Sequence, residues 1–287
     1  MVSQNLSIED GFNLPNSIHK IPKIGFGVYE SPPSQSTQSC LVALKCGYRH
    51  IDTAQYYANE QEVGEAIRLS KLKRSDVFIT TKIIKSEGSV HATYLKLLES
   101  VAKIDGEDGY VDLFLIHTAN GGSRGRKEMY MALEKLLQIG KTKSIGVSNW
   151  GIGHIEELEP IAKVYPPHVN QIELHPFCQQ REIVSFCHKN NMVVEAYCPI
   201  VRGLKNEHPT LVKIAEAHGK KVTQVLLRYS VQKNWVPLPK SDQPWRIAQN
   251  IDIFDFELTE EEMKEMDALD EGSKGAIVVA VTNELQN

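Results

Sequence analysis

The sequence predicts a parallel (β/α)8 barrel, and two observations lead to this fold class. Eight short apolar runs have the β-branched and aliphatic composition of strands that are buried on both faces. The segments between these runs carry apolar residues at helical spacing. A strand followed by a helix, repeated eight times over roughly 250 residues, is typical of a closed barrel rather than of an open doubly wound sheet.

The expected strands are the eight apolar runs, at residues 24–29, 49–54, 76–83, 111–117, 144–149, 169–174, 192–197 and 235–240. Helical spacing is clearest in residues 131–137, before the stop signal Gly140, and in residues 183–187. In such a barrel the carboxyl ends of all strands meet at one mouth. Residues that follow different strands are therefore expected to form a single site.

The two ends of the chain have patterns of their own. The first twenty residues are expected to form a hairpin, with Asp10-Gly11 as its turn, that closes the amino-terminal end of the barrel. Thr259 and Glu262 have the spacing of a capping box, which predicts the start of a final helix. The apolar tail after Gly275 packs either over the barrel mouth or on the outer helices, and the sequence favours neither.

Composition indicates one barrel domain over residues 1–287. Hydrophobic residues make up 41% of the chain, enough for a sizeable core, and no linker-like stretch divides it. The net charge of −4 argues against nucleic acid or an anionic membrane as the main partner. No apolar run approaches the roughly 20 residues of a membrane span, and the amino terminus does not resemble a secretory signal. We therefore expect a cytoplasmic protein, and a monomer because no heptad pattern is visible.

Four polar residues stand at or just beyond the ends of successive expected strands. Asp52 closes the second run and Tyr57 lies just beyond it, while Lys82 closes the third and His117 the fourth. Singly, each is also consistent with a structural role, such as an ion pair at the barrel mouth. Together they predict one active site.

These four residues suit the protonation of an oxygen. The ordinary pKa of a tyrosine, near 10, makes it a poor acid, so a nearby Lys82 ammonium is expected to lower the pKa of Tyr57. Asp52 would keep Lys82 charged, and His117 would orient a substrate carbonyl or transfer a second proton. The set cannot supply a hydride, so a reductive reaction requires a cofactor.

Metal chemistry is not expected. Five cysteines, an odd number without a CxxC pair, indicate neither a disulfide framework nor a zinc site, so we interpret them as packing residues. A metal-dependent hydrolase on a barrel would need clustered His and carboxylate ligands at strand ends, and His117 and Asp52 are too few.

Taken in order, the motifs resemble those of the aldo-keto reductases, a barrel family of nicotinamide-dependent carbonyl reductases. The segment from Asp52 to Glu60 is similar to the family's stretch with an aspartate and a tyrosine five residues apart. The other matching strings follow in the family's order over about residues 20 to 270, namely Thr80-Thr-Lys82, Leu115-Ile-His117, Gly146-Val-Ser-Asn149, Asn170-Gln-Ile-Glu-Leu-His-Pro176 and Pro239-Lys-Ser241. Each string is weakly specific, but the ordered set is strong.

The resemblance implies NADPH as the cofactor. A Rossmann module is disfavoured, because Glu30 stands where the third glycine after Gly25-Phe-Gly27 would fall. The family instead holds the nicotinamide across the barrel mouth, which implies carboxamide contacts from Ser148, Asn149 and Gln171 and ring stacking on Tyr197. Amide and hydroxyl groups suit a carboxamide, and an aromatic face orients the nicotinamide ring.

The last strand and its following segment resemble the family's clamp for the adenosine 2′-phosphate. The resemblance implies phosphate contacts from Lys240, Ser241 and Arg246, with Gln249 and Asn250 at the adenine. Asp242 would repel a phosphate unless it turns away or pairs with Arg246. Cys198 replaces a serine that is common in the family at the pyrophosphate, and Arg202 is a candidate substitute.

The resemblance therefore predicts the reduction of an aldehyde or ketone by NADPH, with the proton donated by Tyr57. The alternative is a nicotinamide-binding regulatory subunit with weak or vestigial activity. The loop of residues 118–126 is short, which suggests an open pocket. Its arginines Arg124 and Arg126 could bind an acidic substrate, although the favoured interpretation is that they are solvated. The candidate pocket walls are Tyr29, Tyr56, Thr118 and Trp150, while the identity of the substrate stays open.

Overall fold

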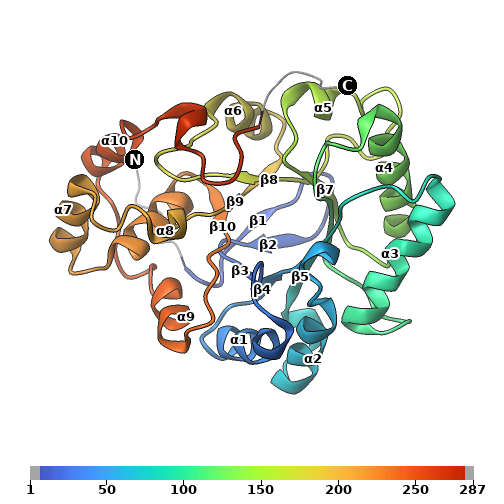
Figure 1. Ribbon diagram of the computed structural model, residues 1–287, viewed down its shortest axis with the longest axis horizontal. Helices are drawn as coiled ribbons and strands as arrows, with labels where there is room; N and C mark the ends of the chain where they lie inside the picture. Colours follow the sequence, from blue (N-terminus) through green and yellow to red (C-terminus); the bar gives the residue numbers. More distant parts are fainter. Residues whose placement is uncertain (1–6, 282–287) are drawn as a thin grey trace.

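The computed structural model describes residues 7–281 and contains the eight-stranded parallel barrel (Figure 1). All eight expected strands are confirmed, each inside its expected range. They are β3 (Phe26–Gly27), β4 (His50–Asp52), β5 (Phe78–Ile83), β6 (Leu113–Ile116), β7 (Ile145–Ser148), β8 (Val169–Glu173), β9 (Val193–Tyr197) and β10 (Trp235–Pro237). Neighbours in the sequence are neighbours in the sheet, from β3 through to β10.

Backbone hydrogen bonds close the sheet into a barrel. The N–H of Gly25 donates to the carbonyl of Pro237 at 3.0 Å, and the N–H of Gly27 donates to that of Pro239 at 3.0 Å. The first strand therefore pairs with the last. Closure brings the carboxyl ends of β4 and β5, which carry Asp52 and Lys82, opposite those of β8 and β9.

Helices surround the strands on the outside (Figure 1). They are α1 (Pro33–Lys45), α2 (Glu60–Ser70), α3 (Val90–Asp105), α4 (Gly122–Gln138), α5 (Ile152–Glu156), α6 (Arg181–Lys189), α7 (Pro209–His218), α8 (Val222–Gln232), α9 (Pro244–Ile251) and α10 (Glu260–Asp267). The large apolar core lies between this ring and the barrel. Within residues 7–281, no helix is both long enough and apolar enough to cross a bilayer.

The two predicted helical runs and the capping box are confirmed, and one loop prediction is wrong. The helical runs 131–137 and 183–187 lie in α4 and α6. The capping box before α10 is formed, because Thr259 Oγ1 accepts from Glu262 N at 3.2 Å and Glu262 Oε2 accepts from Thr259 N at 2.7 Å. The expected loop 118–126 instead enters α4 at Gly122.

The amino-terminal hairpin is present, but its turn was placed wrongly. Strands β1 (Gly11–Asn13) and β2 (Lys20–Pro22) pair antiparallel, so Gly11 opens a strand. The hairpin turn follows at 14–19, where Leu14 N donates to the carbonyl of His19 at 3.1 Å. Asp10 belongs to an earlier turn, in which its carboxylate accepts from Ser7 N at 2.8 Å.

The hairpin closes the amino-terminal end of the barrel, as predicted. Leu14 and Ile21 belong to one buried apolar cluster with residues that open the barrel strands, namely Phe78, Leu113, Val169 and Val193. The opposite end is the carboxyl-terminal mouth, and the predicted site residues lie there.

Two helical glycines differ in the space around them, which gives a test of the packing. A Cβ on Gly64 in α2 would overlap the carbonyl oxygen of Ile104 and lie 2.9 Å from that of Lys103. A Cβ on Gly125 in α4 would have Ser86 Cβ at 3.9 Å as its nearest neighbour. We expect Gly64→Ala to lower the free energy of unfolding by about 1–3 kcal/mol. Gly125→Ala should raise it by about 0.5–1 kcal/mol through helix propensity.

Urea unfolding of the two variants beside the wild type measures both changes. If Gly64→Ala does not lower the free energy of unfolding, the close contact between α2 and the end of α3 is not as described.

Candidate active site

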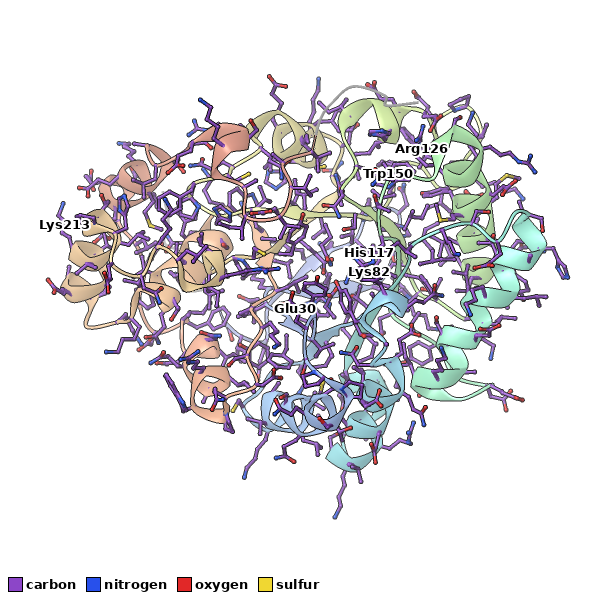
Figure 2. The ribbon with its side chains drawn as sticks, viewed as in Figure 1. Glu30, Lys82, His117, Arg126, Trp150 and Lys213 are labelled. Carbon is purple, nitrogen blue, oxygen red and sulfur yellow. The ribbon has the colours of Figure 1, made fainter. Side chains whose placement is uncertain are left out.

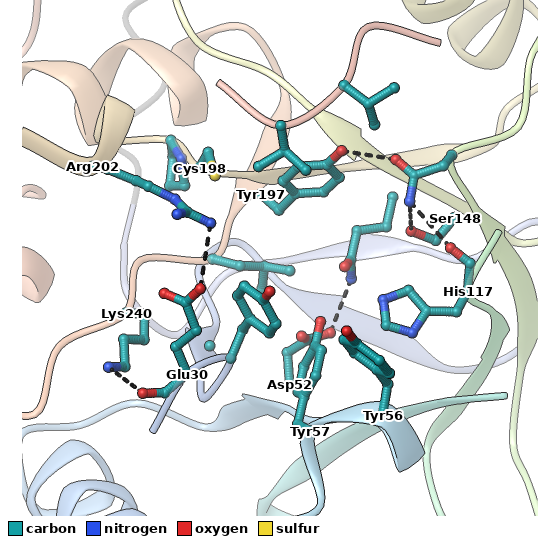
Figure 3. A pocket seen from close by; sticks show the side chains of 18 of the residues that line it. Glu30, Asp52, Tyr56, Tyr57, His117, Ser148, Tyr197, Cys198, Arg202 and Lys240 are labelled. Atoms are coloured by element: carbon teal, nitrogen blue, oxygen red, sulfur yellow. Dashed lines mark hydrogen bonds and ion pairs between the residues drawn. The ribbon is translucent and has the colours of Figure 1, made fainter. Parts of the chain in front are cut away.

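The four predicted catalytic residues come together at the carboxyl end of the barrel (Figures 2 and 3). Asp52 is the last residue of β4, Lys82 lies in β5 and His117 directly follows β6. Tyr57 ends the short helix η1 (Gln55–Tyr57) that follows β4. Lys82 and His117 are seen near the centre of the barrel in Figure 2.

Lys82 is the centre of this group. Its ammonium donates to Asp52 Oδ1 at 2.6 Å, to the carbonyl of Thr53 at 3.0 Å and to Tyr57 Oη at 3.2 Å. The Lys82 side chain is fully buried, which disfavours its charge, but the contacts with Asp52 and Tyr57 together outweigh burial and raise the pKa of Lys82. Lys82 is therefore a cation at neutral pH.

The predicted lowering of the Tyr57 pKa is wrong as a net effect. Burial raises the pKa of Tyr57 to about 12, although the charge of Lys82 acts in the lowering direction, as expected. The sequence argument considered the neighbouring cation and left out burial. Tyr57 is consequently a neutral phenol that accepts a hydrogen bond from Lys82, so its own O–H is available to an acceptor in the cavity.

His117 lies beside Tyr57 as a neutral imidazole. Its ring meets that of Tyr57 edge-on, with the centroids 5.5 Å apart. Burial and the charge of Lys82 lower the pKa of His117 to about 3. Among the described residues, none hydrogen-bonds the buried Nδ1 of His117. The neutral imidazole is therefore suited to donate a hydrogen bond to a carbonyl, and it is less suited to act as an acid, which would require the protonated ring.

A buried carboxyl group that the sequence analysis missed lies next to this group. Gln171 Nε2 donates to Asp52 Oδ2 at 2.9 Å and to Glu195 Oε2 at 2.8 Å. Burial and the charge of Asp52 raise the pKa of Glu195 to about 8. Both N–H bonds of Gln171 are thus used, which leaves its carbonyl oxygen for a donor in the cavity. The sequence signal was a glutamate inside the apolar run of β9.

A cavity of about 480 Å³ opens above these residues (Figure 3). Besides Asp52, Tyr57 and His117, it is lined by eight predicted cofactor or pocket residues, namely Tyr29, Tyr56, Ser148, Asn149, Gln171, Tyr197, Arg202 and Lys240. Cys198, which the sequence analysis placed at the pyrophosphate, lines the cavity too. The sequence analysis did not assign eight further lining residues, which are Gly27, Glu30, Ile84, Pro199, Ile200, Leu238, Val278 and Val279. Most of these lie in loops, where no periodic pattern marks them.

The placement of the apolar tail, which the sequence left open, is settled for its described part. Val278 and Val279 line the cavity, so the tail up to residue 281 lies at the barrel mouth. The rest of the tail lies outside the described residues.

Two predicted pocket walls do not line the described cavity. Trp150 is fully buried with its ring 6.1 Å from that of His154 in α5, away from the barrel centre (Figure 2). Asn149 before it has a φ of 60°, a turn after which the tryptophan enters the core. Thr118 is also absent from the lining, and its hydroxyl accepts from Asn120 N at 3.3 Å.

The expectation of solvated arginines in residues 118–126 is wrong for Arg126. Its side chain is 2% exposed, and its guanidinium binds both carboxylate oxygens of Glu157, at 2.7 and 3.2 Å. Arg124 is exposed on α4 and pairs with Glu128 at 2.8 Å. Neither arginine lines the described cavity.

The acidic residue at the expected phosphate clamp has a partner that was not predicted. Asp242 pairs with Lys240 at 2.6 Å, not with Arg246, and it also accepts from the hydroxyls of Ser31 and Ser39 at 2.6 and 2.9 Å. Arg246 is exposed and stacks on the exposed Trp245, 4.9 Å from the ring centroid.

Four of the predicted cofactor residues do not line the described cavity, namely Ser241, Arg246, Gln249 and Asn250, and the last of them is buried in α9. Arg202 does line it, as expected, but lies 3.9 Å from the carboxylate of Glu30 across the cavity (Figure 3). Each of the predicted anion-binding cations Arg202 and Lys240 therefore already has an acidic neighbour.

Fold and site together are those of a barrel oxidoreductase, and comparison with known proteins gives its family. Residues 23–271 match the model of the Aldo/keto reductase family, and the chain belongs to that family.

Relatives of known name agree with this assignment. The chain is 38% identical to a glyoxal reductase of Bacillus subtilis over 93% of its own length and 95% of that protein. A crystal structure of an aldo/keto reductase from Brucella melitensis is 40% identical, with a TM-score of 0.86 over 91% of this chain and 99% of that one. A Bombyx mori aldo-keto reductase in complex with NADP is 32% identical, with a TM-score of 0.84 over 91% of this chain and 93% of that one.

The buried carboxyl of Glu195 predicts a pH-dependent stability. The pKa of Glu195 is about 8 in the folded protein, against about 4.3 for an exposed glutamate. The folded state therefore binds an extra proton between these pH values. This contribution lowers the free energy of unfolding as the pH rises from about 4.3 through about 8.

We expect Glu195→Gln to lack this decline, so that its stability relative to the wild type increases between pH 5 and pH 9. Urea unfolding across that range measures the difference, with the exposed Glu261→Gln on α10 as the control. A stability difference for Glu195→Gln that does not change with pH would show that Glu195 ionises normally in the folded protein.

Proposed function

We propose that this protein reduces an aldehyde or a ketone to the alcohol, with NADPH as the hydride source and Tyr57 as the proton donor. The contact of Lys82 Nζ with Asp52 at 2.6 Å and with Tyr57 at 3.2 Å, beside the cavity, is the observation that carries the proposal. Family membership and the glyoxal reductase relative support the reaction class.

The residues at the cavity fit a nicotinamide. The free carbonyl of Gln171 suits the N–H groups of a carboxamide, and Ser148 at the end of β7 offers a hydroxyl. Asn149 already accepts from Tyr197 Oη at 2.8 Å and donates to the carbonyl of His117 at 3.1 Å. An incoming carboxamide would thus exchange with the Tyr197 hydroxyl, which frees the Tyr197 ring for stacking.

The proton-transfer residues follow from the same geometry. NADPH, when bound, supplies the hydride that reduces the carbonyl carbon. Tyr57 donates its O–H to the carbonyl oxygen as negative charge develops there. Lys82 stabilises the resulting phenolate, and Asp52 keeps Lys82 charged and in place. The neutral His117 donates a hydrogen bond that orients the carbonyl.

Replacement of Tyr57 tests this assignment. In Tyr57→Phe the proton donor is lost while the packing is kept, so turnover should fall by about 10²–10⁴-fold. The affinity for NADPH should stay close to that of the wild type. Loss of NADPH absorbance against a panel of aldehydes and ketones measures turnover, and Tyr94→Phe on the outer helix α3 is the control.

Normal turnover in Tyr57→Phe would remove Tyr57 as the acid. If the wild type binds NADPH tightly but reduces no carbonyl in the panel, the regulatory alternative replaces the proposal.

Arg246 is proposed to read the 2′-phosphate that distinguishes NADPH from NADH. It is exposed, and no ion pair engages its guanidinium within the described residues, whereas Lys240 is paired with Asp242. A charge-assisted hydrogen bond to phosphate contributes about 1.5–3 kcal/mol. We therefore expect Arg246→Ala to raise the KM for NADPH about 10-fold or more, with the KM for NADH nearly unchanged.

Parallel kinetics with the two cofactors measure this, with the exposed Lys264→Ala on α10 as the control. An equal rise in both KM values would mean that Arg246 does not read the 2′-phosphate.

A further inference from the structure

Glu173 is a second buried carboxylate at the barrel mouth, and the proposed reaction does not use it. It is the last residue of β8, two positions beyond Gln171. Residues two apart in a strand point to the same face, so Glu173 lies one layer above Gln171 on the side of the mouth. Its side chain is fully buried, as is its neighbour His175. A buried charge at this place requires specific partners.

Those partners are mainly backbone N–H groups near the end of the described chain. Glu173 Oε1 accepts from Ile277 N and, at 3.0 Å, from His175 Nε2. Glu173 Oε2 accepts from Val278 N at 2.7 Å and from Val279 N at 2.8 Å. Burial alone would raise the pKa of Glu173, but these hydrogen bonds outweigh it and lower the pKa. Glu173 is therefore an ionised carboxylate that holds three consecutive amides.

Residues 276–281, here called the C-terminal wall, have no helix or strand to satisfy their backbone groups. The N–H of Ala276 donates to the carbonyl of Ser273 at 3.4 Å, and side chains accept from the N–H groups of the next three residues. Gln180 adds one more such contact, since its Oε1 accepts from Val281 N at 2.7 Å while its Nε2 donates to the carbonyl of Glu173 at 2.7 Å. Glu173 nevertheless holds three of the wall's amides, and Gln180 holds one.

The side chains of the C-terminal wall divide between two environments. Ile277 packs against the apolar core. Val278 and Val279 line the cavity and are 55% and 42% exposed. Tyr29, Tyr56 and Ile84 add further apolar or aromatic surface to the same cavity, which the charged Glu30, Arg202 and Lys240 also line. Apolar side chains exposed toward a cavity favour an apolar group of a ligand, which would cover them.

We propose that Glu173 is a positioning residue for substrate selectivity, because its carboxylate fixes the C-terminal wall so that Val278 and Val279 face the carbonyl pocket. The pocket then prefers carbonyl compounds with an extended apolar group over small ones. This inference rests on the proposed reductase function. Glu173 does not take part in proton transfer, and it acts only through the backbone of the wall.

The test is selectivity within a homologous series of aldehydes from propanal to hexanal. In the wild type, kcat/KM with NADPH should rise with chain length as methylene groups are buried against the wall. Glu173→Gln keeps the shape of the side chain but replaces one acceptor oxygen with an NH₂ group that cannot accept from the amides. We expect the hexanal-to-propanal ratio of kcat/KM to fall about 4- to 15-fold, which corresponds to one or two buried methylene groups.

Three further variants separate positioning from general damage. Glu134→Gln removes a carboxylate that also accepts two backbone N–H groups, those of Lys163 and Val164, but does so away from the cavity. It should leave the ratio unchanged. Val278→Ser with Val279→Ser removes the apolar surface directly and should lower the ratio as Glu173→Gln does. Adding Glu173→Gln to this pair should then cause no further loss, and an additive loss would overturn the inference.

Amide hydrogen exchange tests the hydrogen bonds between Glu173 and the C-terminal wall without relying on activity. The amides of residues 277–279 should be protected in the wild type and exchange faster in Glu173→Gln, while Glu134→Gln leaves them unchanged. Unchanged protection in Glu173→Gln would overturn the inference. If the wild type reduces no carbonyl, the proposed function fails, and this measurement still decides the role of Glu173.

Should Glu173→Gln not fold, Val279→Pro removes one donor from the wall itself. This variant should also lower the hexanal-to-propanal ratio of kcat/KM. An unchanged ratio would overturn the proposed role of the hydrogen bonds between Glu173 and the C-terminal wall.

Discussion

The ion pair between Lys82 and Asp52 inside the barrel is the interaction on which the rest of the site depends. Each ion alone would be costly to bury, and removal of one partner of such a pair typically costs about 3–5 kcal/mol. The two side chains meet because β4 and β5 are adjacent parallel strands in the closed sheet. Lys82 in turn contacts Tyr57, and Asp52 contacts Gln171. The position of the acid and the orientation of the amide thus follow from one buried pair.

Burial, which raises the free energy of each ion in the pair, also determines the protonation of the neighbouring groups. At neutral pH, Glu195 keeps its proton because its pKa is raised, and His117 stays neutral because its pKa is lowered. Tyr57 is protonated at its ordinary pKa, and burial raises that pKa further. One cation and one anion are therefore surrounded by neutral hydrogen-bonding groups. Such a site stabilises the charge that develops on a carbonyl oxygen without a competing net charge nearby.

The walls of the cavity are held in place by different parts of the structure from those that hold the catalytic residues. Asp52 and Lys82 lie in strands, and Tyr57 and His117 follow strands closely, whereas many residues of the cavity wall come from loops and from residues 276–281. Two acidic residues join separate segments of the cavity wall through hydrogen bonds. Asp242 binds Lys240 and two serine hydroxyls from the segment around α1, and Glu173 binds three amides of the C-terminal wall. Strands thus give the site its chemistry, while these side-chain contacts shape the space that a ligand enters.

The sequence by itself determined the eight strands, the helix patterns and the four residues at strand ends, because periodicity and strand-end placement are local properties of the chain. It placed the hairpin turn wrongly, since the Asp10 carboxylate is used in a separate turn with Ser7. Only the tertiary structure decided that Trp150 enters the core, that Asp242 pairs with Lys240 and that Tyr57 is a neutral phenol. These outcomes depend on burial and on contacts between residues far apart in the chain, and no local pattern in the sequence records either.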